Sequence, residues 1–305
     1  MKTTRLSIGL IFIFAAIVFN NCAKEEMRLV PGPEGEISSL KKAMTSGYVP
    51  GTDITVQLRS DLENGLSVTL PAGHFYLSET VIIGGYPGGT IKGAGKDLTI
   101  LETTEEYVVS ENPFLPTGYK TSGIIELHNT VGDVTFKAMS FVVKGEHPAE
   151  AHLSPFIGNS TYIDNVIVVL GKEISLECKD LRITGEYVGD IEGAPFDYNI
   201  IWPIIGTGFG TDALFNHLSV KDCDIDGCGG SALDIWMGRT AEFRDNKITN
   251  AGIGIWLQDV YEAVTITDCH FENTPQAILK QVFVDCLCCF KDNTLDGQPM
   301  EDDCQ

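Results

Sequence analysis

The sequence predicts an all-β fold, a parallel β-solenoid of three-sided coils with about 22–24 residues in each coil. The C-terminal third repeats one sequence frame, and each copy carries an aspartate at the same point: Asp222, Asp245, Asp268 and Asp292. Short segments with alternate apolar residues lie between these copies, at 231–236, 253–258 and 276–281. Units this short cannot bury their own apolar faces, but stacked units bury a continuous core.

The repeated frame has the pattern of strands. Its clear copies are 217–227, 240–250, 263–273 and 287–297, and fainter copies are 134–145 and 174–185. Each copy is a short alternating segment, a bend and a second short segment, as strands require. The leucine-rich repeat has a similar period, but its fixed leucine frame with helix-like returns is absent.

The N-terminal half contains motifs of a known superfamily. LSVTLPAGHFYLSETVIIGG (66–85) looks like an opening coil, TIKGAGKDLTIL (90–101) like the next coil, and EISSLKKAMTSG (36–47) like a short capping helix over the open edge of the first coil. On these motifs the chain resembles the right-handed parallel β-helix, or pectate-lyase-like, superfamily over most of 36–297. The resemblance implies one β-helix domain over 36–305 and says little about function.

The first residues read as a targeting segment. Lys2 and Arg5 precede an apolar run, 6–19, that is short for a membrane span, and Cys22 follows shortly after it. The segment 1–21 resembles a bacterial lipoprotein signal, which implies lipidation of Cys22. Asparagines replace the usual small residues before the cysteine, and an ordinary secretory signal is the alternative.

The residues after Cys22 favour display at the cell surface. AKEE resembles the surface-export tag of some Gram-negative lipoproteins, and 22–35 contains Pro and Gly without periodicity, as a tether does. We therefore expect a lipid-anchored protein of the outer membrane that faces outward, with a periplasm-facing anchor as the alternative.

The charge of the chain excludes one class of partner. The formal net charge is −21, and removal of the signal with Lys2 and Arg5 makes it −23. Such a surface repels nucleic acid. An acidic sugar would need a local basic groove or bridging cations to bind.

The cysteines suggest disulfides more than metal. The chain has nine cysteines without a paired CxxC zinc spacing, and an exported chain can form disulfides. If the group at 286–289 is bridged so that it pins the chain end, Cys304 is the expected partner. The pairing of the eight cysteines beyond Cys22 is left open.

The stretch DCDIDG (222–227) has the spacing of half a calcium loop, but Leu233 stands where a bidentate acid is needed. We interpret the repeated aspartates as bend positions of successive coils. The residue after each one, Cys or Asn, fits an inward slot where Asn can hydrogen-bond to backbone groups. The neighbouring bases Lys221, Arg244 and Lys291 would offset the stacked charge, and a bound cation is the alternative.

Candidate site residues come from columns that should face outward. One column runs through Lys221, Arg244, Thr267 and Lys291, and another through Asp234, Trp256 and Leu279. The candidates for catalysis are Asp234, Arg239 and Arg244. The candidates for substrate binding are Trp236, Trp256, Lys221 and Trp202. The structural alternative is tryptophans packed under a loop and charges that are merely solvated.

The resemblance implies a type of chemistry for such a site. Substrates of the superfamily lie along an outer sheet face, where lyases use a basic residue and often calcium, and hydrolases use paired carboxylates. The adjacent aspartates followed by Gly-His-Gly of polygalacturonase-like hydrolases are absent. For an enzyme, these observations favour a polysaccharide lyase over a glycoside hydrolase. No cofactor is required, and the resemblance allows Ca²⁺.

Three segments interrupt the repeat: 102–122, 145–165 and 186–216. His147, Glu150 and His152 could be read as a metal cluster, but their surroundings favour a loop, so no metal site is predicted. The aromatic residues around Trp202 either cover the solenoid or form the wall of a groove.

We expect a surface lipoprotein that binds or processes polysaccharide, contacting the membrane through its lipid anchor. The alternatives within this expectation are a lyase and a noncatalytic glycan-binding protein. A structural or adhesive surface protein without a groove is the third hypothesis. The sequence predicts neither the glycan nor the oligomeric state.

Overall fold

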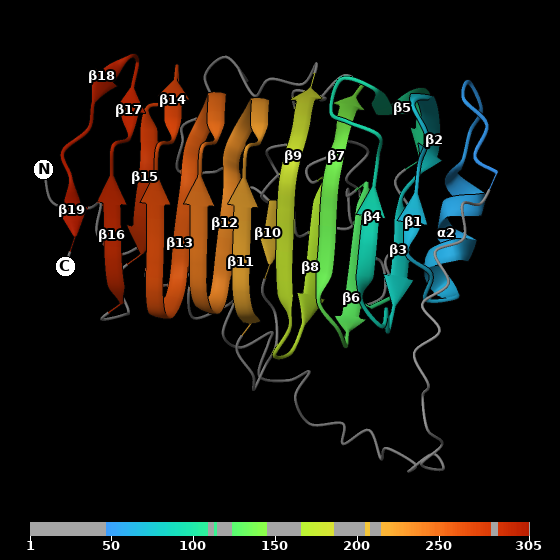
Figure 1. The fold of residues 1–305 in the computed structure, drawn as a ribbon, viewed down its shortest axis with the longest axis horizontal. Helices are drawn as coiled ribbons and strands as arrows, with labels where there is room; N and C mark the ends of the chain where they lie inside the picture. Colours follow the sequence, from blue (N-terminus) through green and yellow to red (C-terminus); the bar gives the residue numbers. More distant parts are fainter. Residues whose placement is uncertain are drawn as a thin grey trace, which may run out of the picture. The chain divides into compact units, whose positions relative to one another are not determined.

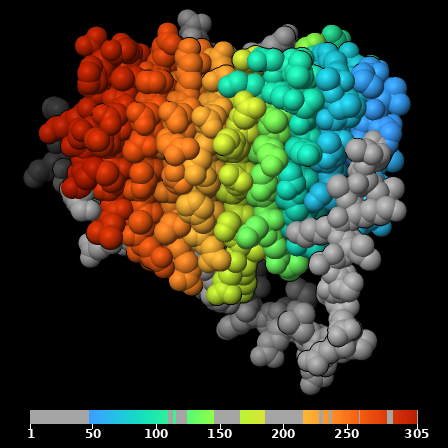
Figure 2. Space-filling model, in the orientation of Figure 1, coloured from blue at the N-terminus to red at the C-terminus, as the bar shows by residue number. Residues whose placement is uncertain are grey.

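Parallel strands stack coil upon coil in this protein, as a computed structural model shows (Figure 1). The structure describes residues 47–108, 113–114, 124–144, 166–185, 205–207, 215–281 and 286–304. These all lie in one unit of the chain, Lys41–Gln305. In the space-filling view, successive coils form neighbouring bands of colour (Figure 2). The predicted all-β parallel β-helix is confirmed.

Three sheets run along the stack, one for each side of the coils. The first consists of β1 (Val68–Thr69), β4 (Gly89–Lys92), the first parts of β7 (Val134–Val143) and β9 (Ser175–Gly185), β11 (Phe215–Lys221), the last parts of β12 (Asp224–Arg244) and β13 (Lys247–Thr267), and β16 (Leu287–Lys291).

The second sheet consists of β2 (Gly73–Glu79), β5 (Thr99–Val108), the ends of β7 and β9, the beginnings of β12 and β13, β14 (His270–Glu272) and β17 (Thr294–Leu295). The third consists of β3 (Val81–Gly84), β6 (Ile125–Thr130), β8 (Ile167–Gly171), β10 (Ile205–Thr207), the middle parts of β12 and β13, and β15 (Gln276–Gln281).

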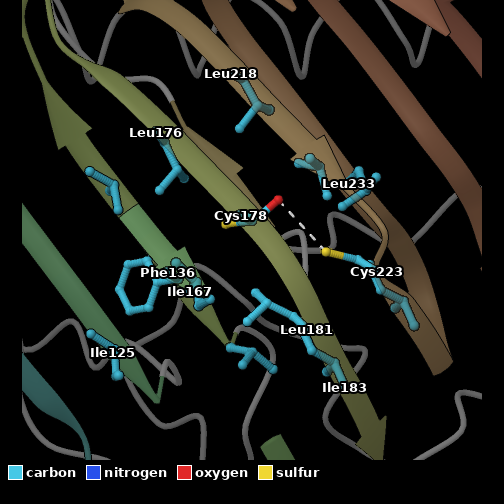
Figure 3. Close-up of a cluster of buried hydrophobic side chains, with 14 of the residues drawn as sticks. Ile125, Phe136, Ile167, Leu176, Cys178, Leu181, Ile183, Leu218, Cys223 and Leu233 are labelled. Atoms are coloured by element: carbon cyan, nitrogen blue, oxygen red, sulfur yellow. Dashed lines mark hydrogen bonds between the residues drawn. The ribbon is translucent and has the colours of Figure 1, made fainter. Parts of the chain in front are cut away.

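The core is built from columns of equivalent apolar residues. In the first sheet the parallel register aligns one inward column, and every member is buried: Val68, Ile91, Phe136, Cys178, Val220, Phe243, Ile266 and Phe290. Side chains from all three sheets pack together in the interior of the coils (Figure 3). Because strands stack about 4.8 Å apart, each apolar side chain packs on its counterpart in the next coil.

The repeated aspartates occupy a bend between the first and second sheets. Asp222, Asp245, Asp268 and Asp292 all have φ between 53° and 57°. Aspartate tolerates this left-handed conformation better than most residues with a side chain. The described residues contain no group of three or more potential metal ligands. The left-handed φ values at the junction of the two sheets confirm the interpretation of these aspartates as bend residues.

The next position is an inward slot in which Asn and Cys alternate. Asn246 Oδ1 accepts a hydrogen bond from the Cys223 N–H at 3.1 Å, and its Nδ2 donates to the Val220 carbonyl at 2.8 Å. Two coils later, Asn293 repeats this with the Cys269 N–H and the Ile266 carbonyl, both at 2.9 Å. This confirms the predicted hydrogen bonding of Asn in the slot.

The thiols in these slots are chemically quiet. Burial raises the pKa of Cys223 to about 12 and that of Cys269 to about 11, so both stay protonated at neutral pH. They therefore act as small apolar fillers, as the sequence interpretation expects.

Two of the three predicted bases pair with the stacked aspartates, and the third pairs with another acid. Arg244 pairs with Asp245 at 3.3 Å, and Lys291 pairs with Asp292 at 3.4 Å, as expected. Lys221 instead pairs with Glu242 at 2.6 Å, because the parallel register brings the next coil's outward acid beside it.

A helix covers the first coil. It is α2 (Thr55–Glu63), and its fully buried Leu58 and Leu62 pack toward β1, β2 and β3 (Figure 1). This helix was not predicted from the sequence, and the capping helix expected at 36–47 lies outside the described residues apart from its last position. In the described part of the chain, no helix is both long and apolar enough for a membrane span.

Two antiparallel strands and a disulfide close the last coil. β18 (Gln298–Pro299) pairs with β17, and β19 (Asp303–Cys304) pairs with β16. A disulfide joins Cys289 to Cys304, and another joins Cys286 to Cys288. The expected role of Cys304 in pinning the chain end is confirmed. β19 and β18 cover the free edges of β16 and β17, which removes sites for unwanted strand pairing.

Asn246→Ala should destabilise the protein by about 2–4 kcal/mol, because the Cys223 N–H and the Val220 carbonyl would both be buried without partners. Urea unfolding followed by circular dichroism measures this change. Thr249→Ala is the control, since it removes an exposed 2.6 Å hydrogen bond to Asp226 and should cost under about 1 kcal/mol. Equal costs would contradict a structural role for the slot.

Cys304→Ser should lower the free energy of unfolding by about 3 kcal/mol, since the bridge closes a loop with a sequence separation of 15 residues. Unfolding of both proteins with and without reductant measures this effect. The difference should vanish in reductant, and a difference that persisted there would mean that the disulfide is not its cause.

Candidate functional site

Asp234, the first predicted catalytic residue, lies on the outer side of the third sheet. Its neighbours Leu233 and Ile235 point into the core, so the alternation of the strand places Asp234 on the opposite face. Trp256 and Leu279 follow it in register, as predicted. Asp234 is nevertheless only 6% exposed, so it is not an open surface carboxylate.

The surroundings of Asp234 favour its neutral form. Its Oδ2 accepts a hydrogen bond from Gln258 Nε2 at 2.8 Å, while its Oδ1 is buried with no hydrogen-bond partner among the described residues. Burial raises the pKa of Asp234 to about 8. In the part of the chain that the structure describes, the buried Trp256 Nε1 in the next coil also has no hydrogen-bond partner. At neutral pH this residue is therefore an enclosed carboxylic acid.

The predicted basic residues are engaged by other acids. Arg239 lies between the third and first sheets and pairs with Glu262 at 3.2 Å. Arg244 is on the first sheet beside Asp245. The structure thus puts Asp234 and Arg244 on different sheets and does not bring them to one groove.

The remaining predicted residues are placed only in part. Lys221 is on the first sheet and is paired with Glu242. The backbone of Trp236 belongs to β12, but its side chain, like the whole of Trp202 and Cys22, lies outside the described residues. Their roles in substrate binding and lipidation stay predictions.

A groove of about 640 Å³ lies instead on the outer side of the second sheet, at the N-terminal coils. Its lining comes from the strands β2 and β5 and from Lys144, the residue that follows β7: Tyr76, Ser78, Glu79, Glu102, Thr103, Thr104, Glu105, Glu106, Val108 and Lys144. We call it the β2–β5–β7 groove. It combines hydroxyl, carboxylate, ammonium and aromatic groups, as polar-ligand sites do.

An irregularity in β5 shapes this groove. Leu77 of β2 lies opposite Thr103 of β5, and Glu79 lies opposite Val108. Between these two pairs, β2 advances by two residues and β5 by five. The extra residues of β5 leave the regular ladder, and the adjacent Glu105 and Glu106 are exposed. Bulges commonly redirect side chains in this way.

Glu102 is held between two bases at the groove. It is 8% exposed, and Lys144 Nζ contacts its Oε1 while His74 Nε2 lies 2.8 Å from its Oε2. The His74 contact is an ion-pair distance and not an aligned hydrogen bond. Thr103 Oγ1 donates to the Lys144 carbonyl and accepts from the Lys144 N–H, at 3.1 and 2.8 Å, which fixes the base.

Two rings border this cluster. His74 and Tyr76 are stacked with their centroids 5.0 Å apart, and both lie on the outer face of β2. Tyr76 is also in register with Glu102 on the next coil. A preformed ring surface beside fixed polar groups is suited to a ligand with one apolar and one polar side.

This groove was not predicted from the sequence. Residues 66–85 were predicted only as an opening coil, and 102–122 only as an interruption of the repeat. The available signal was the pair of outward rings followed by Glu102, Glu105 and Glu106 one coil later. Recognising it requires the register between β2 and β5, which the irregular spacing of these early coils hides.

Asp234→Asn should remove a pH dependence of stability. The folded-state pKa of about 8 lies above the ordinary carboxyl value of 3.8, so this group's contribution to stability is fully present at low pH and is lost as the pH rises toward 8. The loss is about 1.4 kcal/mol per pH unit at most. Urea unfolding from pH 5 to 9 measures it.

The variant should be the more stable protein at pH 8, since Asn can keep the bond from Gln258 without carrying charge. Parallel pH profiles of variant and parent would contradict the burial of Asp234 as an acid.

Comparison with protein families places the fold. Residues 182–297 match a family model described as a right handed beta helix region. Searches among curated proteins and among solved structures find no match. The coils before residue 182 continue the same three sheets in parallel register with the matched ones. The family match and the continuous parallel register together identify the fold as a right-handed parallel β-helix.

Proposed function

We propose that this protein is a cell-surface lipoprotein that binds or processes polysaccharide, and that the β2–β5–β7 groove is its glycan site. The observation that carries the proposal is the stacked pair His74 and Tyr76 beside the fixed carboxylate of Glu102. Sugars present an apolar ring face and a rim of hydroxyl groups. A ring surface next to immobilised acceptors and donors complements both.

The dimensions of the groove support a polymer as the ligand. It spans β2, β5 and the end of β7, which belong to three successive coils. Strands in a sheet lie about 4.8 Å apart. This spacing is comparable to the length of one sugar unit in an extended chain, so neighbouring coils can contact neighbouring units.

Rigidity of the site also supports binding. Glu102 and Lys144 are fixed by each other and by Thr103, and all three lie on or next to strands of the ladder. Groups that are held in place before the ligand arrives lose little conformational entropy on binding. The placement at the cell surface rests on the lipoprotein-like start of the sequence and on Cys22.

Tyr76→Ala should weaken glycan binding by about tenfold or more, since removal of a stacking ring costs about 1–3 kcal/mol at comparable sites. The full chain in mild detergent would be tested by retardation in gels loaded with neutral, acidic and amino-bearing polysaccharides. Ultraviolet absorbance from unsaturated uronates and new reducing ends would report cleavage in the same panel.

Tyr261→Ala is the matched control, because Tyr261 is an exposed tyrosine on β13, outside the groove lining. It should leave retardation unchanged. Retardation that is equal in both variants, or absent for every polysaccharide, would reject the groove as a glycan site.

A further inference from the structure

We infer that the β2–β5–β7 groove selects a glycan that carries positively charged amino groups and discriminates against polyuronates. The inference rests on the proposed function and adds the substrate class of that same site. It comes from the charges that remain without an ion-pair partner after the contacts of the groove are assigned.

Two of the four glutamates in the lining already have basic partners. Glu79 pairs with Arg59 of α2 at 3.0 Å. Glu102 contacts both Lys144 and His74. The charge of each of these acids is balanced within the protein, and Lys144, the base in the lining, is engaged by Glu102.

Glu105 and Glu106 are different. Both are exposed on the irregular part of β5 and line the groove. Among the residues that the structure describes, neither forms an ion pair with a base. Within the described part of the chain, they therefore give the groove two negative charges that no base balances. An ammonium group on a bound sugar would form charge-assisted hydrogen bonds with them.

One buried polar atom in the lining also lacks a hydrogen bond. Thr104 Oγ1 lines the groove and has no hydrogen-bond partner among the residues that the structure describes. Buried polar atoms normally find a partner. A polar ligand lying across the rings can supply this partner. This observation does not depend on the charge of the two glutamates.

The same charges disfavour a uronate. Its carboxylate would approach Glu105 and Glu106, and like charges brought together in an interface lower affinity. The net charge of −21 on the whole chain adds a long-range repulsion of polyanions. Charge thus argues against the acidic substrates that the resemblance to lyases first suggested.

The test uses three hexasaccharides: glucosamine hexamer, its N-acetylated form and galacturonic acid hexamer. Calorimetry on the full chain in mild detergent at low salt and pH 6 should show the glucosamine hexamer binding about tenfold tighter than the N-acetylated one, and the galacturonate weakest. Glu105→Gln with Glu106→Gln should remove this preference and change the affinity for the N-acetylated hexamer less than about twofold.

The matched control carries Glu301→Gln with Asp302→Asn, which removes two acids from the exposed C-terminal segment. It should keep the preference for the amino sugar. A preference lost equally in this control would mean that net charge, and not the groove, is responsible, and would overturn the inference.

The failure of the inference is distinct from that of the proposed function. Binding of all three hexamers with similar affinity and dependence on Tyr76 would overturn the amino-sugar preference and support the glycan site. Binding of none of them, together with no retardation of any polysaccharide, would overturn both.

Discussion

The structure depends on one constraint, which is that each coil must end in register with the coil before it. The backbone ladder continues even through the bend: the N–H groups of Asp222, Asp245 and Asp268 donate to carbonyls of the following coil at 3.1–3.2 Å. A left-handed residue at the same point of each coil is what keeps the bend uniform. The inward Asn and Cys positions then connect neighbouring coils through side-chain contacts as well. The apolar columns follow from the same register, because it aligns equivalent residues of successive coils.

The same constraint explains where a site can arise. Regular coils place equivalent residues in columns, so outward charges of consecutive coils either pair, as Lys221 and Glu242 do, or repel. A groove with several different groups requires a local departure from the regular ladder. The extra residues of β5 between Thr103 and Val108 are such a departure. Function in this fold is thus expected at irregular coils, while regular ones provide the scaffold.

The regular coils could be predicted from the sequence, and the irregular ones could not. The period, the strands of the C-terminal coils and the outward columns through Arg244 and Asp234 were predictable, because aspartate at a left-handed bend marks the repeat directly. α2 was not, because its nine residues show only Leu58 and Leu62 as a buried helical pair. The burial of Asp234 was also beyond reach, since strand alternation gives the face of a residue but not what covers it.

The β2–β5–β7 groove could not be predicted for a related reason. Its residues come from coils whose spacing is irregular, so no column links them in the sequence. The contacts of Glu102 with His74 and Lys144 join positions that are far apart in the chain. Local patterns carry information about turns and periods, and only the folded register shows which distant polar groups converge.

Hydrogen exchange of the full chain with and without glucosamine hexamer tests most directly where the ligand binds. The account predicts slowed exchange of backbone amides in β2, in β5 and at the end of β7, with little change elsewhere. Slowed exchange around Asp234 and Trp256, with β2 and β5 unchanged, would contradict the groove as the glycan site and return that role to the outer side of the third sheet.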